Sequence, residues 1–341
     1  MLVTVTGASG HVGNNLVRRL LASGRNVRAL VGPRDRASLA GLRVEVIECD
    51  VRDAGAVRQH LRGSDVVYHL AAVISLEARD EALMRDVNVT GVRHVVDACR
   101  DEGVRRLVHF SSVHAFEADA TERVVNEQRA FTTDARDPAY NRCKAEGTRL
   151  VLDAVDKGLD AVILHPAGIL GPNDFNPSHI GRYVLDVMRR KIPALVEGGY
   201  NFCDVRDVVT SAVTAELHAP RGARYILGGA WTSMGDIARW VGEATGVKVP
   251  RMVTPLWLAR LGLPLMSLQA RVRGAHPVYT SASLHALATQ RHVCDALARA
   301  DLGHEPRAIE RSVKDTARWF TEHLAPTDQS GRFPALAPAR G

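Results

Sequence analysis

Two side chains able to exchange protons, Tyr140 and Lys144, stand four residues apart in this sequence. Residues i and i+4 share one face of a helix, so the phenol and the ammonium can point into one site. A free tyrosine has a pKa of about 10, and a fixed cation beside it favours the phenolate and lowers that pKa. Such a pair can exchange a proton with a carbonyl or alcohol oxygen. Because surface helices also produce this spacing by chance, its weight depends on the elements upstream.

A glycine-rich turn near the start of the chain is the first of these elements. Residues 2–6 alternate and are β-branched, which predicts a strand, and apolar residues follow at helical spacing in 14–21. Between them stand Gly7, Gly10 and Gly13. Glycines there permit a tight turn, close approach of the backbone to a pyrophosphate, and close packing of the helix on the strand. An ordinary glycine-rich turn is the alternative, but the strand–turn–helix context favours a dinucleotide site.

The residues after the second expected strand, 27–31, bear on the type of dinucleotide. About 20 residues beyond the glycines, an acidic residue would bind the adenosine ribose and favour NAD, whereas an arginine would accept a 2′-phosphate. The strand tip carries Gly32 rather than an acid, and Arg28, Arg34 and Arg36 are close by. The pattern therefore favours NADP, with NAD as the open alternative.

The next two expected strands also end in residues suited to a ligand. Residues 44–49 predict a third strand that runs into Asp50, and Asp53 is the better cap for the helix that follows. Residues 66–72 predict a buried fourth strand, and the small residues at its end allow the backbone to approach a cofactor. Both strand ends are expected at the same edge of a parallel sheet as the glycine turn.

A fifth expected strand, residues 105–112, ends in two hydroxyl side chains. A serine at the carboxyl edge of an α/β sheet lies where such sheets bind ligands. A lone serine there is usually a cap or turn residue. Together with Tyr140 and Lys144 downstream, however, Ser112 is favoured as a group that holds the reacting oxygen.

Length and composition limit the classes of protein. A chain of 341 residues exceeds the usual size of one core and predicts a large α/β domain with a smaller lobe. Its 46% apolar and 24% charged residues are typical of a soluble globular protein, and no apolar run reaches membrane-spanning length. The start has no signal-peptide layout, so we expect a cytoplasmic protein without a membrane partner.

Charge and cysteines point to neither nucleic acid nor metal. The net charge is +6, but the arginines occur in pairs on separate expected elements, without interleaved aromatic residues. The five cysteines are scattered without metal-ligand or disulfide spacing. His165 has no partner of ligand type nearby in the sequence, so we expect no metal site.

The glycine turn Thr6-Gly7-Ala8-Ser9-Gly10-His11-Val12-Gly13 has the spacing TGxxGxxG, which resembles the extended short-chain dehydrogenases/reductases. Ser112 in Leu-Val-His-Phe-Ser-Ser is similar to the catalytic serine of that family, and Tyr140 with Lys144 matches its Tyr-x-x-x-Lys motif. The resemblance covers about residues 1–324. It is nearest to dihydroflavonol-4-reductase-like members, with some similarity to bacterial hopanoid-associated epimerase-like and 3β-hydroxysteroid dehydrogenase-like members.

This resemblance implies a Rossmann-type, doubly wound parallel sheet with a smaller C-terminal substrate-binding lobe. It implies Ser112, Tyr140 and Lys144 as catalytic residues and Asp50 as the partner of the adenine amino group. Most extended members carry Arg-Pro where this chain has His165-Pro166, which leaves local contacts open. The residues expected to bind the cofactor are Gly7, Ser9, Gly10, His11, Val12, Gly13, Arg34, Asp50, Val51, Leu70, Ala71, Ala72, Tyr140, Lys144 and Pro166.

The expected domain boundaries follow from the same family resemblance. Residues 1–175 are expected to form the cofactor domain, and 176–324 mainly the substrate lobe, with some segments returning to the core. Residues 325–341 are expected to be a loose tail. The polar segment 113–137 is assigned to the substrate mouth because long loops in compact domains are usually functional. The apolar stretch Pro255–Val272 is expected to be lobe core; an apolar substrate wall or an interface is the alternative.

The expected function is hydride transfer between NADP(H) and a carbonyl or secondary alcohol of a small molecule. The alternatives are an NAD-dependent nucleotide-sugar epimerase, a 3β-hydroxysteroid dehydrogenase-like enzyme, and, from another class, a catalytically silent NADP-binding regulator. Dehydration is disfavoured because Val113-His114 stand where sugar dehydratases carry Asp-Glu. The family resemblance is compatible with a homodimer.

Overall fold

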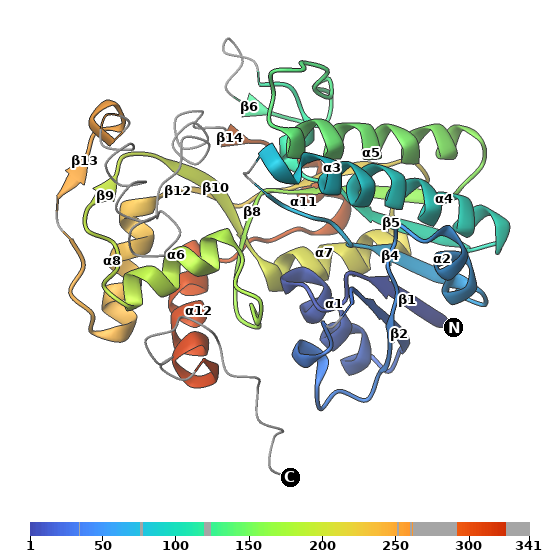
Figure 1. Cartoon of the computed structure of the whole chain (residues 1–341), viewed down its shortest axis with the longest axis horizontal. Coiled ribbons are helices and arrows are strands. Elements are labelled where there is room, and N and C mark those ends of the chain that lie inside the picture. The colour runs from blue at the N-terminus through green and yellow to red at the C-terminus, as the bar shows by residue number, and fades with distance from the viewer. Residues whose placement is uncertain are drawn as a thin grey trace.

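The computed structural model describes residues 1–33, 35–75, 78–118, 124–250, 252–259, 261 and 292–324. Its centre is a seven-stranded sheet in which every neighbouring pair is parallel (Figure 1). The strands are, in sheet order, β11 (Arg224–Leu227), β7 (Ala161–Pro166), β5 (Arg106–Phe110), β4 (Val66–His69), β1 (Leu2–Thr6), β2 (Asn26–Val31) and β3 (Glu45–Glu48). The predicted Rossmann-type doubly wound sheet is confirmed.

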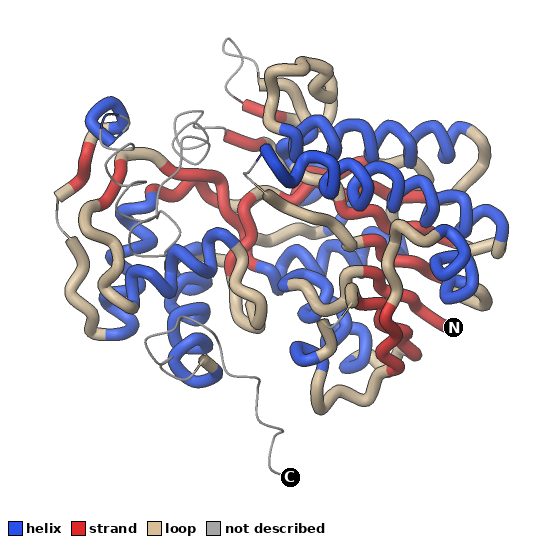
Figure 2. Tube along the Cα trace, viewed as in Figure 1, coloured by secondary structure: helices blue, strands red, loops and turns tan. Residues whose placement is uncertain are grey.

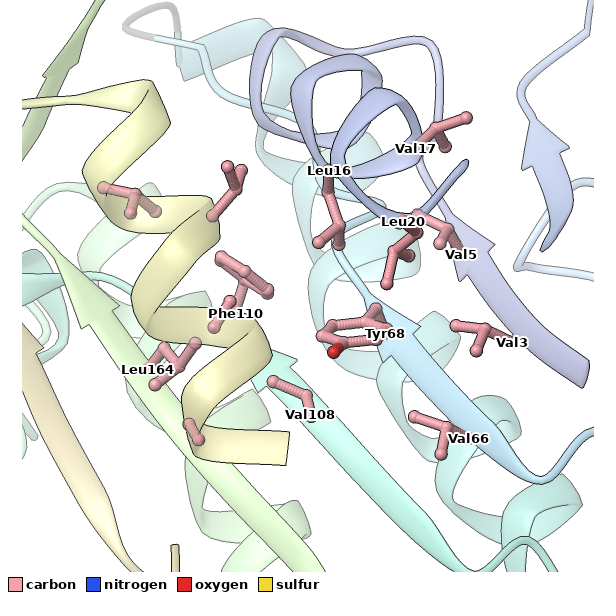
Figure 3. Packing of buried hydrophobic residues seen from close by; sticks show 14 of the residues in the cluster. Val3, Val5, Leu16, Val17, Leu20, Val66, Tyr68, Val108, Phe110 and Leu164 are labelled. Atoms are coloured by element: carbon pink, nitrogen blue, oxygen red, sulfur yellow. The ribbon is translucent and has the colours of Figure 1, made fainter. Parts of the chain in front are cut away.

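Helices cover both faces of this sheet, which explains why its central strands are apolar on both sides. One face carries α1 (His11–Ala22), α7 (Val205–His218) and α11 (Ala296–Leu302), the other α2 (Ala54–Leu61), α4 (Gly91–Asp101) and α5 (Ala139–Asp156). Figure 3 shows the first face, where Leu16 and Leu20 lie over Tyr68. All three side chains are fully buried.

The strand order reverses between β1 and β4, and this fixes where a ligand can bind. From β1 the chain winds outward through β2 to β3, then returns to β4 and continues to β5, β7 and β11. In an open parallel sheet the crevice for a ligand lies at such a reversal, outside the carboxyl ends of the strands. The glycine turn after β1 and the segment after β4 meet there.

A second core lies beside the sheet (Figure 2). It is built from a three-stranded sheet and three helices, with further short strand pairs at its margins. These elements are β8 (Gly168–Leu170), β10 (Gly199–Asp204), β12 (Ala230–Ser233), α6 (His179–Met188), α8 (Met234–Thr245) and α12 (Ile309–His323), with the pairs β9 (Leu195–Val196)–β13 (Val253–Thr254) and β6 (Val124–Val125)–β14 (His292–Val293). Meanwhile β11, α7 and α11 belong to the large sheet and its first core.

The segment 113–137 contains one fully buried aromatic residue, Phe116, which forms a β-bridge with Phe131. Residues 119–123 lie outside the described residues, and the assignment of the segment to the substrate mouth stays a prediction. The stretch Pro255–Val272 is only partly lobe core: Leu256 packs on the second core, whereas Trp257 is 64% exposed. Arg260 and residues 262–272 of that stretch lie outside the described residues.

The helical segment after β4 also contains a local irregularity. A short helix α3 (Glu81–Arg85) runs into a π-helical turn, Asp86–Thr90, before α4 begins. Hydrophobic periodicity predicts the helix but cannot show the extra residue of a π turn. None of the helices in the described part of the chain is long and apolar enough to cross a bilayer.

Candidate active site

The first turns of α5 hold the tyrosine and lysine. Pro138, extended at φ −49° and ψ 139°, precedes the helix, so Tyr140 lies in its first turn and Lys144 one turn later. The Lys144 side chain is buried, and its Nζ donates to the Phe110 carbonyl oxygen at 3.0 Å. That bond fixes the ammonium at the carboxyl end of β5. Its Nζ lies 6.0 Å from the centre of the Tyr140 ring.

Ser112 completes the group from the end of β5. Its Oγ accepts from the His114 backbone N–H at 3.2 Å and also hydrogen-bonds the Tyr140 side chain. The ring of His114 meets the Tyr140 ring edge-on, with 6.2 Å between centroids. The structure thus brings the three predicted side chains together at one sheet edge. Their catalytic roles stay a prediction.

The pKa of Tyr140 differs from the sequence expectation. Burial raises it to about 12, and the hydrogen bond to Ser112 only partly offsets that rise. The prediction that the neighbouring cation lowers this pKa is therefore wrong for this structure, because desolvation of the phenolate sets the direction of the shift and Lys144 is not among its causes. Burial also lowers the pKa of Lys144, to about 8. At neutral pH the phenol keeps its proton and is suited to donate it.

The glycine turn lies directly against the chain after β4. Gly7 has φ +65°, and a Cβ placed on it would come within 2.6 Å of the Ala71 backbone nitrogen. A Cβ on Gly13 would come within 2.2 Å of the Gly7 carbonyl oxygen. Thr6 Oγ1 adds a second link by accepting from the backbone N–H groups of Leu70 and Ala71, at 3.3 Å each. The close approach of these backbones to a cofactor stays a prediction.

The start of α1 fits an anion. Gly10 caps the helix without a side-chain hydrogen bond, and the first turn contains no acidic residue. The first backbone N–H groups of a helix lack intrahelical acceptors and carry partial positive charge. The residues from Ser9 to Gly13 therefore fit a pyrophosphate, which a dinucleotide would bring.

The comparisons with known proteins agree with this geometry. The model of the NAD dependent epimerase/dehydratase family matches residues 3–228. The chain belongs to this family. It is 36% identical to "Sterol demethylase protein B" of Methylococcus capsulatus, over 94% of this chain and 99% of that protein. It is 31% identical to a "Putative dihydroflavonol 4-reductase" of Synechocystis, over 94% of each chain. The crystal structure of gox2253 matches with a TM-score of 0.81 and 30% identity, covering 94% and 98% of the two chains.

Membership of the epimerase/dehydratase family confirms the predicted resemblance and makes the chain an NAD(P)-dependent enzyme acting on CH–OH or C=O groups.

Two glycines of the turn after β1, Gly10 and Gly13, allow its packing to be tested. Gly13→Ala is expected to cost about 1–3 kcal/mol of stability, because the new methyl group meets backbone. Gly10→Ala is the matched control, since its Cβ would meet only the Gly7 oxygen, at 3.4 Å.

We expect Gly10→Ala to keep the wild-type melting temperature but to bind the dinucleotide about tenfold more weakly, because its methyl group stands at the mouth of the turn. Thermal unfolding and cofactor titration by fluorescence measure the two effects. Equal melting temperatures for Gly13→Ala and wild type would contradict the packing described for the turn.

Two side chains expected to contact the cofactor are engaged within the protein. The Ser9 hydroxyl donates to Asp35 at 2.5 Å, and His11 Nε2 lies 3.1 Å from the carbonyl oxygens of Gly171 and Pro172. Asp35 is a residue that sequence reasoning missed. The strand tip itself lacks an acid, but the turn after β2 brings this carboxylate back to the glycine turn.

The residues at the ends of β3 and β4 differ in their hydrogen-bond partners and in their burial. The Asp50 carboxylate binds the backbone and guanidinium of Arg52, at 2.5–3.0 Å. Asp53 accepts from Ala56 N at 3.0 Å, which confirms it as the cap of α2. Val51 and Pro166 are buried, and Leu70, Ala71 and Ala72 are partly buried after β4.

The two nearby arginines that the structure describes, Arg28 and Arg36, have different partners. Arg28 binds Glu45 and donates to the carbonyls of His60 and Arg62, at the end of α2. It is therefore directed away from the carboxyl edge. Arg36 pairs with Glu48 at 3.0 Å and is exposed, whereas Arg34 lies outside the described residues.

Asn88, on the π-helical turn, is a second residue that the sequence did not reveal. Its side-chain amide accepts from and donates to the backbone of Val73, at 2.8 Å in both bonds. The backbone carbonyl oxygen of Asn88 faces Gly147 of α5, and a Cβ placed on Gly147 would come within 2.6 Å of that oxygen. Asn88 therefore ties the segment after β4 to the helix that carries Tyr140, and π turns often occur at functional sites.

His165, which replaces the arginine usual in the family, is a core residue. It is fully buried, its Nδ1 lies 3.2 Å from the Ser112 carbonyl oxygen, and its ring stacks near Phe116 and Phe131. Burial lowers its pKa to about 3. Across the described ranges, no group of three or more ligand-type side chains is placed to hold a metal ion.

Proposed function

We propose that this protein is an NADP(H)-dependent reductase that converts a carbonyl group into a secondary alcohol, and the reverse. The observation that carries the proposal is the meeting of Ser112, Tyr140 and Lys144 at the sheet edge next to the glycine turn. Three groups from two elements converge where a parallel sheet binds its ligand. A catalytically silent regulator has no need of them in one place.

Each side chain has a distinct task in this proposal. When bound, the nicotinamide supplies the hydride. Tyr140 is protonated because burial raises its pKa, so it gives its proton to the carbonyl oxygen. Ser112, already bonded to Tyr140, positions that oxygen. Lys144, anchored on the Phe110 carbonyl, supplies positive charge and holds the nicotinamide ribose with its other N–H groups.

NADP is the proposed cofactor because Gly32 stands at the tip of β2 and Arg36 is 56% exposed beyond it. The competing feature is Asp35, whose carboxylate is taken by Ser9 and Asn176, at 2.5 and 2.9 Å. We expect a higher kcat/KM with NADPH than with NADH. Arg36→Ala is expected to reduce that preference about fivefold or more, and Arg58→Ala, an exposed ion-paired arginine on α2, to leave it unchanged. Equal preference in both variants would remove Arg36 from the phosphate site.

Two candidate substrates have specific support from the relatives. The similarity to a putative dihydroflavonol 4-reductase favours a ketone on an apolar ring system. The similarity to a sterol demethylase protein favours a fused-ring 3-hydroxy or 3-keto compound, as in the 3β-hydroxysteroid dehydrogenase-like alternative. Both substrates are apolar carbonyl or alcohol compounds, and both would react by the same hydride transfer.

Initial rates of NADPH oxidation with a dihydroflavonol, a 3-ketosteroid and simple ketones test the proposal. Turnover is expected with at least one ring ketone. Interconversion of a UDP-sugar by protein that carries copurified NAD would favour the epimerase alternative instead. Tight NADPH binding without oxidation of any carbonyl compound would favour the silent regulator and overturn the proposal.

A further inference from the structure

The positive charge of the chain is concentrated in one segment. From Ala244 to Cys294 there is no aspartate or glutamate. The same segment carries six basic side chains, equal to the formal net charge of +6 of the whole chain: Lys248, Arg251, Arg260, Arg271, Arg273 and Arg291. The remainder of the protein is therefore neutral overall. Such a distribution favours a partner that is negatively charged and meets the protein at one place.

The described part of this segment also exposes large apolar side chains. We call five of them the apolar tip: Met252 (68% exposed), Val253 (52%), Trp257 (64%), Leu258 (46%) and Leu261 (71%). Leu256 and Ala259, on the other side of the same short helix, pack against the second core. One side of this helix is thus anchored on the core, and the other presents apolar side chains to solvent.

The apolar tip lies far from the cofactor site. Figure 1 shows β13 and the helix after it at the end of the molecule opposite β1 and β2. Isolated exposed apolar residues are common on soluble proteins, but five within ten positions form a patch of the kind that marks an interaction site. Lys248, exposed just before the tip, places a cation beside it.

We infer that the apolar tip docks the protein on the surface of a bilayer containing anionic phospholipid. Exposed tryptophan and leucine side chains in a stretch of sequence that is rich in basic residues are typical of a helix that lies in the membrane surface without crossing it. The acid-free segment adds attraction to anionic headgroups. A nucleic acid would use the cations and could stack a base on Trp257, but the other four exposed side chains of the tip are not aromatic and offer it no comparable contact.

Sedimentation of the full-length protein with vesicles tests this inference. Wild type is expected to bind vesicles of phosphatidylcholine with phosphatidylglycerol, and to bind pure phosphatidylcholine at least about tenfold more weakly. Raising the salt concentration should weaken binding to the anionic vesicles. The double variant Trp257→Ser/Leu261→Ser is expected to lose about tenfold or more in partitioning, since it removes two apolar anchors.

Leu217→Ser is the matched control, because Leu217 is 53% exposed on α7, outside the acid-free segment. It should bind vesicles like wild type. Circular dichroism and the melting temperature show whether each variant folds. If the double variant does not fold, the conservative Trp257→Phe replaces it: anionic vesicles should shift the wild-type tryptophan emission to shorter wavelength, and this shift should be absent in the variant.

Two outcomes would overturn the inference. One is wild type that ignores anionic vesicles, which leaves a protein partner or another part of this chain as the occupant of the tip. The other is equal vesicle binding by wild type and the double variant. The measurement needs neither substrate nor turnover, so its failure is independent of any failure of the proposed reductase activity.

Discussion

Tyr140→Phe is expected to lower kcat for carbonyl reduction by about 10²–10⁴-fold, the usual contribution of a positioned general acid. In the proposed mechanism the phenol is the proton donor, and burial keeps it protonated by raising its pKa to about 12. Phenylalanine keeps the ring that packs beside His114. Cofactor affinity should change little, because Lys144 and the glycine turn are untouched. Steady-state rates and cofactor titration of the same preparation separate the two effects.

A neighbouring pair of serines supplies the matched control for this site. Ser112→Ala removes the hydroxyl bonded to Tyr140 and is expected to reduce kcat, with a smaller effect than Tyr140→Phe. Ser111→Ala removes the adjacent hydroxyl, which is hydrogen-bonded to Thr148 Oγ1 at 2.6 Å rather than to Tyr140. This variant is expected to keep kcat close to the wild-type value. Near-normal turnover by Tyr140→Phe would refute the acid role assigned to the phenol.

The parts of the site that the sequence predicts are those defined by local spacing. The four-residue interval between Tyr140 and Lys144 sets their common face, and Gly13 is required by its contacts with Gly7 and Ala8 inside one βα unit. The order of strand, turn and helix repeats regularly up to β5. It therefore fixes the sheet edge at which Ser112 must lie.

The parts that the sequence does not predict depend on residues distant along the chain. Asp35 reaches Ser9 through a turn whose path has no local signal, and Asn176 binds that carboxylate from 141 positions away. The pKa of Tyr140 follows from how much protein surrounds the phenol, which spacing cannot show. Likewise Leu256 and Trp257 are adjacent and similarly apolar, yet packing buries one against the second core and leaves the other exposed.

The second large effect is expected in acid. Three histidines, His69, His109 and His165, lie on neighbouring strands β4, β5 and β7 and are at most 2% exposed. The rings of His69 and His109 stack at 5.5 Å, and both ring nitrogens of His109 are buried without a hydrogen-bond partner. Burial lowers the pKa of His69 and of His165 to about 3, and that of His109 well below its ordinary value.

These lowered pKa values make the folded state sensitive to pH. In the unfolded chain histidines take up protons as the pH falls below about 6.5. In the folded protein His69 and His165 stay neutral until about pH 3, and burial likewise keeps the pKa of His109 well below its ordinary value. Their contribution to stability is thus present above pH 6.5 and is lost as the pH falls through this window. With up to three protons involved, the free energy of unfolding should fall by as much as about 4 kcal/mol per pH unit.

Urea unfolding at pH 7, 6 and 5 measures this slope. His109→Leu is expected to reduce it by about one proton, or about 1.4 kcal/mol per pH unit, because leucine has no proton to take up in the unfolded chain. His218→Gln, at an exposed position at the end of α7, should keep the wild-type slope. A slope unchanged by His109→Leu would show that His109 does not stay neutral in the fold. A reduced slope would show that His109 contributes to the acid sensitivity of the fold. The three histidines lie on the strands next to Lys144, and its ammonium contributes to lowering the pKa of each of them.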